Sequence, residues 1–232
     1  MQRLTYYMTA DVSDDLVEVA EALQYTRGGF LRPNLYLDHS TGHVHRDRLD
    51  RAYTSLEAEL PTWVPLVVNL EHTRWITEGN GPVTGYEWFR RRESVAMFMR
   101  ARFVNRLIGS WGEPVSNHPL TFRSGKSWTV AAVSAYWRDG QSFGDWHFAA
   151  KERLRHALPF ELPVVQYVSP VIWRGRGKAE PMPVETWAGV CDAVAAMDGV
   201  DIVEFWFNQA DFDQDYVVRS LRRLAHAIRG AA

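Results

Sequence analysis

Short apolar runs of strand length alternate with amphipathic segments along almost the whole chain, and this alternation limits the choice of fold more than any other feature. The amphipathic segments carry apolar residues at the spacing of one helix face. Strands are predicted over 4–8, 33–38, 65–71, 128–136, 164–170 and 201–207. Helices are predicted between and after them, from Asp11 or Ser13 to Gly28 and over about 46–60, 86–108, 142–158, 184–197 and 213–229. Because right-handed crossovers return the chain in one direction, a parallel sheet covered by helices is expected.

The sheet is predicted to close into a barrel. No G-x-G-x-x-G fingerprint follows the first strand and no P-loop occurs, so the usual nucleotide-binding signatures of open α/β sheets are missing, and no cofactor is expected. The chain has 232 residues and no evident linker, which fits one barrel domain. The predicted fold is a single α/β domain over 1–232, a TIM-like (β/α) barrel that is distorted or has fewer than eight regular strands.

Composition argues against several classes of partner. The net charge of −2 does not indicate nucleic acid. No run approaches the ~20 apolar residues of a membrane span, and the first residues lack the apolar core of a signal peptide, so a cytoplasmic location is the default expectation. Cys191 is the only cysteine, which excludes an internal disulfide and a cysteine-based zinc site. The 10 Trp residues fit either an aromatic core or a binding face with flat walls.

The sharpest candidate for chemistry is the end of the third predicted strand, because parallel α/β folds bind ligands at the carboxyl ends of their strands. Asn69 and Glu71 point to the same side of this strand, about 6–7 Å apart. Apolar barrel walls raise a carboxyl pKa, and a protonated Glu71 can donate a proton to a leaving-group oxygen, as glycoside hydrolysis requires. The Asn69 amide can orient a substrate group. Alternatively, Glu71 pairs with Arg74 at the surface and Asn69 caps a loop.

Side chains at the other strand ends are expected to complete a sugar cleft. The predicted substrate-binding residues are Asp38, Tyr136, Trp137, Tyr167, Trp206 and Asn208. Aromatic rings give such a cleft flat amphipathic walls, and a few polar groups fix the orientation of the ligand. A carbohydrate is therefore the expected partner, and the sequence leaves the oligomeric state open.

Histidines near the same strand ends allow a different chemistry. His43 and His45 form an H-x-H pair that could hold zinc together with Asp38 or Glu71. In barrel hydrolases that bind metal, such a pair ends the first strand, whereas here it follows the second predicted strand within a turn. Solvated loop histidines are the simpler interpretation, so no metal ligand is predicted.

The segment 67–75, Val-Val-Asn-Leu-Glu-His-Thr-Arg-Trp, resembles the strand of hyaluronidases that ends in a D-x-E pair followed by a Trp-containing loop. Other segments are similar to parts of that family in the same order: 35–38 with Gly42, the helix around 98–108, the strand 128–136, and 201–206 followed by Asp211 and Phe212. The resemblance is spread over most of the chain, and its most specific parts are the N-x-E segment and the last strand.

This resemblance implies a distorted α/β barrel that acts on a polysaccharide. Glu71 would be the proton donor, and Tyr136, Tyr167 and Trp206 would shape the sugar subsite. Asn69 stands where the family has an aspartate that positions the N-acetyl group of the substrate. An amide can hydrogen-bond that group but cannot stabilise a developing positive charge.

Three functions therefore remain open. The leading hypothesis is a glycoside hydrolase with Glu71 as general acid. The second is a non-catalytic carbohydrate-binding or structural barrel of glycosidase ancestry, which the amide at position 69 favours. The third is a metal-dependent hydrolase that uses Asp38, His43 and His45.

Overall fold

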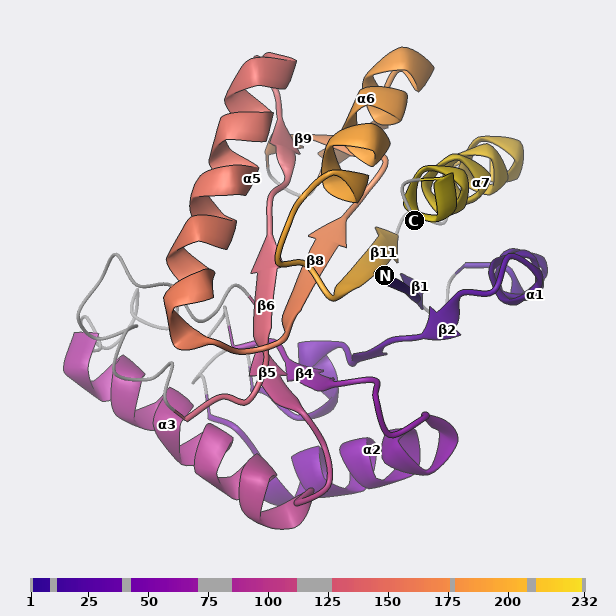
Figure 1. Ribbon diagram of the computed structural model, residues 1–232. Helices are drawn as coiled ribbons and strands as arrows, with labels where there is room; N and C mark the ends of the chain where they lie inside the picture. The colour runs from indigo at the N-terminus through magenta and orange to yellow at the C-terminus, as the bar shows by residue number, and fades with distance from the viewer. Residues whose placement is uncertain are drawn as a thin grey trace. The chain divides into compact units, whose positions relative to one another are not determined.

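A computed structural model describes residues 2–8, 12–38, 43–70, 85–111, 127–175, 178–207 and 212–230 (Figure 1). Glu71 and Asn208, two of the predicted site residues, lie outside these ranges. Contacts within the chain divide it into two compact units. Unit 1 comprises Met1–Arg27, Ser134–Arg155 and Val164–Ala232, and unit 2 comprises Gly28–Val133 and His156–Pro163.

Unit 1 is built on parallel strands, as the alternation of strands and helices predicts. Strand β11 (Ile202–Phe207) pairs in parallel with β1 (Arg3–Met8) on one side and with β8 (Val164–Val168) on the other. The short strand β2 (Thr26–Arg27) pairs in parallel with β1. The order of these strands is thus β2-β1-β11-β8. The α/β class and its parallel sheet are confirmed.

Helices cover one face of this sheet (Figure 1). They are α1 (Asp14–Ala22), α6 (Val184–Ala195) and α7 (Gln214–Gly230). Phe205 of β11 is fully buried on this face, with its ring edge-on to Tyr25 and Trp187 at centroid distances of 6.4 and 6.2 Å. The polar atoms of both neighbours reach α7, where Tyr25 Oη donates to the Leu221 carbonyl and Trp187 Nε1 to the Ser220 carbonyl. Burying Phe205 alone contributes roughly 1.5–3 kcal/mol.

A second, mixed sheet lies in unit 1, and most of it falls in the segment 171–183, for which the sequence predicts neither a strand nor a helix. Strand β9 (Val171–Gly175) pairs antiparallel with β10 (Lys178–Pro181) and parallel with β7 (Trp137–Arg138). Arg174 joins the sheet to both neighbours, since it forms ion pairs with Asp139 and Glu180. The charge of Arg174 is therefore engaged within a hairpin. Helix α5 (Phe143–Ala157) follows β7 in the chain.

Unit 2 contains three parallel strands in the order β3-β4-β5: β3 (Gly29–Phe30), β4 (Leu66–Val68) and β5 (Ile108–Ser110). Helices α2 (Arg46–Glu59) and α3 (Gly85–Arg102) share a core with them. This core includes Leu49, Tyr53, Leu56, Leu66, Val68, Met99, Phe103 and Ile108. A parallel bridge between Trp111 and Ala132 leads to β6 (Ala131–Ser134), through which the chain passes into unit 1.

Three boundaries differ from the prediction for local reasons. The expected strand 33–38 is instead a 3₁₀ helix, η1 (Pro33–Leu35), because Pro33 lacks an N–H group and is preset for a helix start. Helix α1 ends well before Gly28. Gly29 lies in β3, where an added Cβ would be 1.9 Å from the Pro65 carbonyl oxygen, so only glycine lets these backbones approach.

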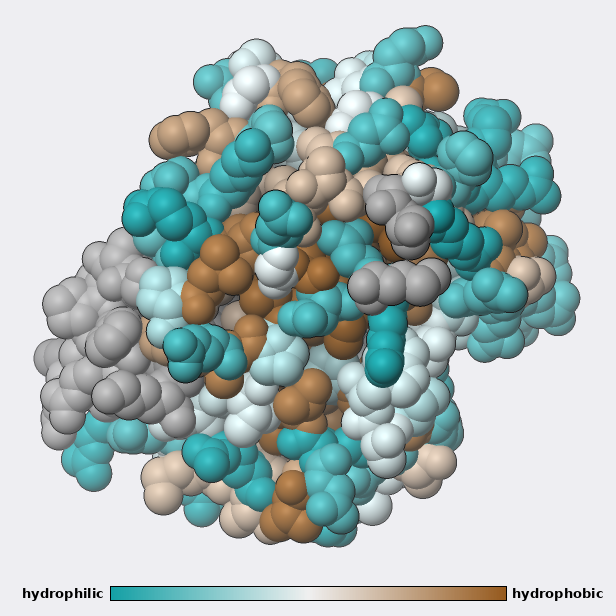
Figure 2. Space-filling view, viewed as in Figure 1, coloured by the Kyte–Doolittle hydropathy of each residue, from teal (hydrophilic) through white to brown (hydrophobic). Residues whose placement is uncertain are grey.

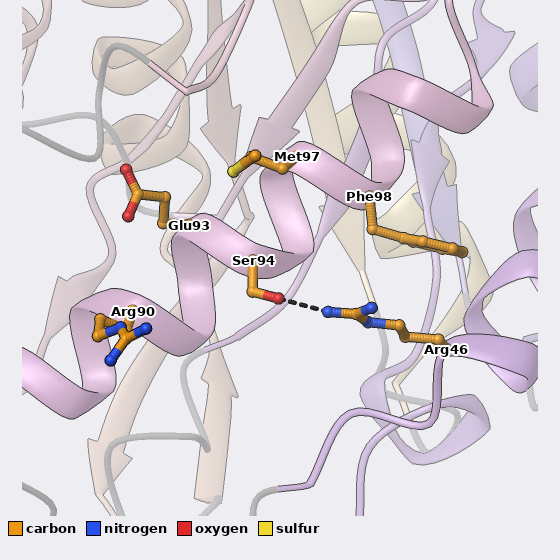
Figure 3. A pocket seen from close by; sticks show the side chains of 6 residues that line it. All are labelled: Arg46, Arg90, Glu93, Ser94, Met97 and Phe98. Carbon is orange, nitrogen blue, oxygen red and sulfur yellow. Dashed lines mark hydrogen bonds between the residues drawn. The ribbon is translucent and has the colours of Figure 1, made fainter.

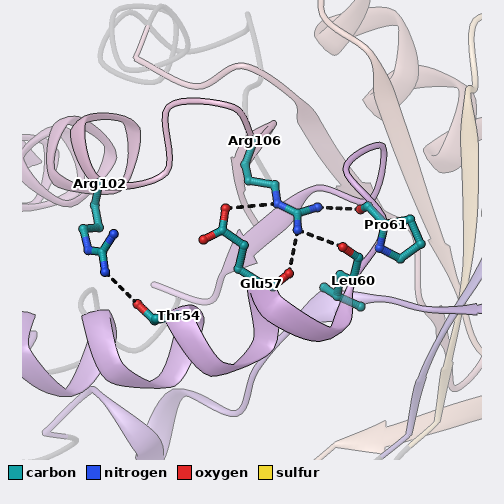
Figure 4. A network of polar contacts seen from close by, with 6 residues as sticks. All are labelled: Thr54, Glu57, Leu60, Pro61, Arg102 and Arg106. Carbon is teal, nitrogen blue, oxygen red and sulfur yellow. Dashed lines mark hydrogen bonds and ion pairs between the residues drawn. The ribbon is translucent and has the colours of Figure 1, made fainter.

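Arg106 closes the end of α2 (Figure 4). Its guanidinium donates to the carbonyl oxygens of Glu57, Leu60 and Pro61, and its Nε also contacts Glu57 Oε1 at 3.2 Å. The last carbonyls of a helix have no partner within the helix, so a planar fork of donors satisfies several at once. The Arg106 side chain is only 5% exposed, which makes these bonds structural.

Hydrophilic and apolar side chains both reach the face drawn in Figure 2. The large apolar residues that are exposed come from many elements: Leu35, Met97, Val104, Phe143, Phe148, Leu158 and Val184. Exposed apolar residues scattered in this way are normal for a protein surface. None of the helices in the described ranges has the length and apolar character of a membrane span.

Candidate functional site

The face of the unit 1 sheet opposite α1, α6 and α7 carries a transverse row of polar side chains. The strand register places Thr5 of β1 beside Glu204 of β11, and Glu204 beside Tyr167 of β8. Paired residues of neighbouring strands point to the same face, and Phe205 points to the helices, so this row points away from them. All three residues are buried, at no more than 2% exposure.

Glu204 is a buried acid with only half of its hydrogen-bonding capacity used. Thr5 Oγ1 donates to Glu204 Oε2 at 3.0 Å. The other oxygen, Oε1, is inaccessible to solvent and has no hydrogen-bond partner among the described residues. Burial raises the pKa of Glu204 to about 8, and the bond from Thr5 offsets only part of this effect. The carboxyl group is therefore mainly uncharged at neutral pH.

Tyr167 is held in the same environment. Its pKa is raised well above the usual value, first by burial and then by the neighbouring Glu204 and Tyr136. The phenol therefore stays protonated and can act as a hydrogen-bond donor across the physiological range. Glu204 and Tyr167 together therefore offer hydrogen-bond donors and carry little charge at neutral pH.

Tyr7 of β1 and Trp206 of β11 lie two residues further along their strands, toward the carboxyl ends. Together with Tyr136, which follows β6, and Trp173 of β9, they form a group of rings that we call the aromatic cluster. Trp206 is its centre. Its ring stacks on Tyr7 at a centroid distance of 6.4 Å, and it contacts Tyr136 and Trp173, each at 5.7 Å. Tyr136 and Trp173 also meet edge-on at 5.9 Å. Trp206 and Tyr136 are only partly buried, so the cluster is open to solvent on one side.

The cluster also offers a polar donor. Trp173 Nε1 is shielded from solvent and has no acceptor within the described part of the chain. Buried indole N–H groups usually have a partner, so this one is available to a ligand. Apolar ring faces combined with a few unpaired polar atoms are typical of small-molecule sites. The arrangement suits a ligand with an apolar face and peripheral hydroxyl groups, and a sugar has both.

The structure brings together three of the predicted site residues within unit 1. Tyr136, Tyr167 and Trp206 lie on the same face of unit 1. Trp137 belongs to a different group, in which its ring stacks on Trp146 of α5 at 6.0 Å and lies 6.3 Å from Phe143. Its part in a sugar cleft stays a prediction, as do those of Glu71 and Asn208, which lie outside the described residues.

Asn69 and Asp38 lie in unit 2, near the end of β4. The Tyr36 hydroxyl accepts from the Asn69 N–H at 2.8 Å and donates to the Asn69 carbonyl at 3.2 Å. Tyr53 fixes the strand one step earlier, since its hydroxyl donates to the Val67 carbonyl at 2.6 Å. Two tyrosines thus hold the backbone that leads into Glu71. Asp38 is partly buried, and its N–H donates to the His43 carbonyl at 2.9 Å.

The histidine pair does not extend into a metal site within the described ranges. The rings of His43 and His45 lie edge to face, with centroids 4.8 Å apart. In the part of the chain that the structure describes, no three His, Cys, Asp or Glu side chains gather closely enough to hold a metal ion. The described geometry therefore gives the metal-dependent alternative no support beyond the H-x-H pattern.

A pocket of about 400 Å³ lies along α3 in unit 2 (Figure 3). It is lined by Arg46, Arg90, Glu93, Ser94, Met97 and Phe98. Arg46 donates to Ser94 Oγ at 2.5 Å, and its guanidinium lies 5.8 Å from the centre of the Phe98 ring. None of the predicted site residues that the structure describes lines this hollow, so we do not assign it to the functional site.

Sequence reasoning missed Glu204, Trp173, Tyr7 and Thr5. The signal for Glu204 was a single acid within the apolar run 202–207, two residues before Trp206. A charged residue in a strand that is apolar on both faces needs an explanation, and the i, i+2 spacing would have placed it beneath the tryptophan. Trp173 gave no such signal, because it lies in the segment 171–183, for which no strand or helix was predicted.

Comparison with known proteins shows that the fold is similar to that of glycoside hydrolases. No protein-family model matches the sequence, and no curated protein matches it. Among solved structures, bee venom hyaluronidase matches with a TM-score of 0.60 and 12% identity, over 99% of this chain and 99% of that chain. The same enzyme in complex with a hyaluronic acid tetramer matches with a TM-score of 0.56 and 11% identity, over 99% and 98%.

A Bacteroidetes-affiliated GH5 cellulase linked with a polysaccharide utilization locus also matches, with a TM-score of 0.52 and 12% identity, over 98% of this chain and 91% of that chain. Identities this low show the fold alone. The expected distant resemblance to hyaluronidases is confirmed at this level, and it extends to other glycoside hydrolases.

Proposed function

We propose that this protein is a glycoside hydrolase that acts on a polysaccharide or glycan. The observation that carries the proposal is the aromatic cluster at the carboxyl ends of the unit 1 strands, centred on Trp206 above the buried Glu204. The fold likeness to a hyaluronidase and a cellulase supports the same class of ligand. In this proposal one sugar ring lies against Trp206, with its hydroxyl groups near Trp173 Nε1.

The proposed general acid is Glu71. It follows β4 by three residues, and the strand leading to it is held by Tyr36 and Tyr53. A firmly placed strand end suits an acid that must approach a glycosidic oxygen within hydrogen-bond distance. Asn69 would orient the substrate, through an amide that can donate and accept but carries no charge. Asp38 and Asn208 are proposed to bind further hydroxyl groups.

The proposal includes the expected architecture, one distorted (β/α) barrel domain over 1–232. A structural match to bee venom hyaluronidase over 99% of this chain and 99% of that chain supports it. Strands β3, β4 and β5 and strands β2, β1, β11 and β8 form parallel sets, which are the parts that such a barrel requires.

A second candidate is a carbohydrate-binding protein without catalysis. One observation favours it: position 69 holds an amide where hyaluronidases have an aspartate. Hydrolysis commonly needs two carboxyl groups, or a carboxylate that stabilises positive charge. A protein that has lost this carboxylate can keep the aromatic cluster and still bind sugars.

Reducing-end release from a panel of polysaccharides, with and without N-acetylhexosamine, tests the proposal. Wild type is compared with Glu71→Gln, which keeps the size of the side chain but cannot donate a proton from a carboxyl. We expect release by wild type and a loss of at least 100-fold in the variant, the usual contribution of general acid catalysis. Sugar binding without release by either protein would favour the non-catalytic candidate.

A further inference from the structure

Beneath the aromatic cluster lies an acid to which the proposed function assigns no role. Glu204 precedes Trp206 by two residues in β11, so both side chains are on the same face of the sheet. Their Cα atoms are about 6–7 Å apart along the strand. Glu204 is therefore the polar group directly below the ring at the centre of the cluster.

The surroundings of Glu204 keep it uncharged. Its neighbours in the row are Thr5, which donates to Oε2 at 3.0 Å, and Tyr167, a buried phenol. No charged side chain in the described ranges contributes to its pKa, which burial raises. Arg174, a cation on the same strand as Trp173, is engaged by Asp139 and Glu180.

The second carboxyl oxygen is unused. Glu204 Oε1 is inaccessible to solvent and, among the described residues, has no hydrogen-bond partner. Trp173 Nε1 is also inaccessible to solvent and has no hydrogen-bond partner among the described residues. The centroids of the Trp173 and Trp206 rings are 5.7 Å apart. Buried polar atoms without partners are rare in folded proteins, and two of them around one aromatic cluster indicate that a partner arrives with the ligand.

We propose that Glu204 binds the ligand of the aromatic cluster directly, through Oε1, which shares a hydrogen bond with a sugar hydroxyl, and that it thereby selects neutral sugars over uronates at this position. A neutral carboxyl group can both donate to and accept from a hydroxyl group. A uronate carboxylate at the same place would lose its water without gaining a cation, which is costly in a buried site. This inference rests on the proposed carbohydrate function and specifies its ligand.

Three β-1,4-linked tetrasaccharides that differ in one substituent provide the probes: cellotetraose, chitotetraose and the tetramer of glucuronate. Binding to the whole protein is measured by calorimetry. We expect at least one neutral tetramer to bind tenfold or more tightly than the glucuronate tetramer. Glu204→Gln should keep this preference, because its amide is an uncharged donor and acceptor. Glu204→Met should weaken neutral binding about tenfold, which is what one hydrogen bond to a buried group contributes.

Two readouts separate ligand binding from a structural role. Glu204→Met leaves the buried Thr5 hydroxyl without its acceptor, so this variant should lose some stability whatever the role of Oε1. Glu204→Gln keeps an acceptor for Thr5 and should unfold near the wild-type temperature, whereas a purely structural acid would lower the unfolding temperature of both variants. Infrared difference spectra of wild type should show a protonated carboxyl band that shifts when the neutral tetramer binds, and this band should be missing in Glu204→Gln. The infrared measurement uses only wild type and Glu204→Gln, so it tests the proposal even if Glu204→Met does not fold. Glu185→Gln, an exposed acid in α6, is the matched control.

Binding of a neutral tetramer with an unshifted carboxyl band would overturn this inference and leave the proposed function intact. Equal affinity for the glucuronate tetramer would also overturn it. Absence of binding by all three tetramers would overturn the inference too, while reducing-end release from larger polysaccharides would still decide the proposed function separately.

Discussion

Thr5 Oγ1 donates a hydrogen bond to Glu204 Oε2 at 3.0 Å, across two strands that lie 199 positions apart in the sequence. The bond joins the first strand of the chain to the last and fixes an acid beneath the aromatic cluster. The neighbours of Glu204 in its row are the Thr5 hydroxyl and the Tyr167 phenol, so the row gives the carboxyl group polar neighbours but no cation. Its protonation state therefore affects the stability of the folded protein.

The stability contributed by Glu204 should fall as the pH rises. Its pKa is about 8 in the folded protein and about 4.5 in the unfolded chain. Between these values only the unfolded chain releases the proton, so the free energy of unfolding decreases by at most about 1.4 kcal/mol per pH unit and then levels off above pH 8. Thr5 does not titrate, and the raised pKa of Tyr167 keeps that group out of this range.

Urea unfolding of wild type and Glu204→Gln from pH 5 to pH 9 measures this effect. The difference between the two free energies should change across pH 5–8 and be constant above it. Glu185→Gln, which removes an exposed acid, should not reproduce the trend. A difference that is independent of pH would mean that Glu204 titrates normally in the folded protein.

Arg106→Leu should destabilise the protein by about 2–3 kcal/mol. The substitution removes the donor to the Leu60 carbonyl and one of two donors to the carbonyls of Glu57 and Pro61, which keep their bonds from the N–H groups of Leu60 and Val64. A lost charged hydrogen bond typically costs about 1.5–3 kcal/mol. Thermal or urea unfolding provides the measurement. Arg102→Leu is the matched control, because Arg102 is 44% exposed in its ion pair with Asp50, and such pairs contribute at most about 1 kcal/mol. Equal losses in the two variants would refute the capping role.

Gly29→Ala should be strongly destabilising, although the change is a single methyl group. The new Cβ would be 1.9 Å from the Pro65 carbonyl oxygen, so β3 and β4 must separate, and overpacking of this kind costs about 1–3 kcal/mol or more. Gly144→Ala in α5 has no contact closer than 3.6 Å at the added Cβ and should be neutral or stabilising. Unfolding midpoints of the two variants give the comparison, and a tolerated Gly29→Ala would show that the strands can move apart.

Trp173→Phe should weaken sugar binding without affecting the fold. The substitution keeps an aromatic ring beside Trp206 and removes only the indole N–H, which has no acceptor among the described residues. A hydrogen bond lost from a bound sugar corresponds to a fall in affinity of about three- to tenfold. Calorimetric titration with cellotetraose and chitotetraose measures it. Unchanged affinity would place the ligand elsewhere on the cluster.

The regular elements were largely predictable from the sequence. The last strand was expected over 201–207 and is observed as Ile202–Phe207, and helix α2 was expected over 46–60 and is observed as Arg46–Glu59. In both cases an apolar run or a helical stripe of sufficient length determines the element, with no competing turn signal. Strands β2, β3, β5, β7, β9 and β10 were missed, because two to five residues are too few to show a period.

The candidate site was only partly predictable. Tyr136, Tyr167 and Trp206 were identified because each lies at the end of a strand. Trp137 could not be separated from Tyr136, since which of two adjacent residues faces the site depends on where the strand begins. Glu204 was missed because a site at strand ends draws attention to the last residues, whereas its position is the middle of β11.

The most direct test of the central claim is whether oligosaccharides bind at Trp206. We would titrate wild type, Trp206→Leu and Trp63→Leu with cellotetraose and chitotetraose by calorimetry, with circular dichroism to verify folding. Trp63 is a partly buried tryptophan in unit 2 and serves as the control. We predict that wild type and Trp63→Leu bind at least one tetramer and that Trp206→Leu, although folded, loses most of this affinity. Binding by Trp206→Leu at the wild-type level would contradict the assignment of the aromatic cluster as a sugar site.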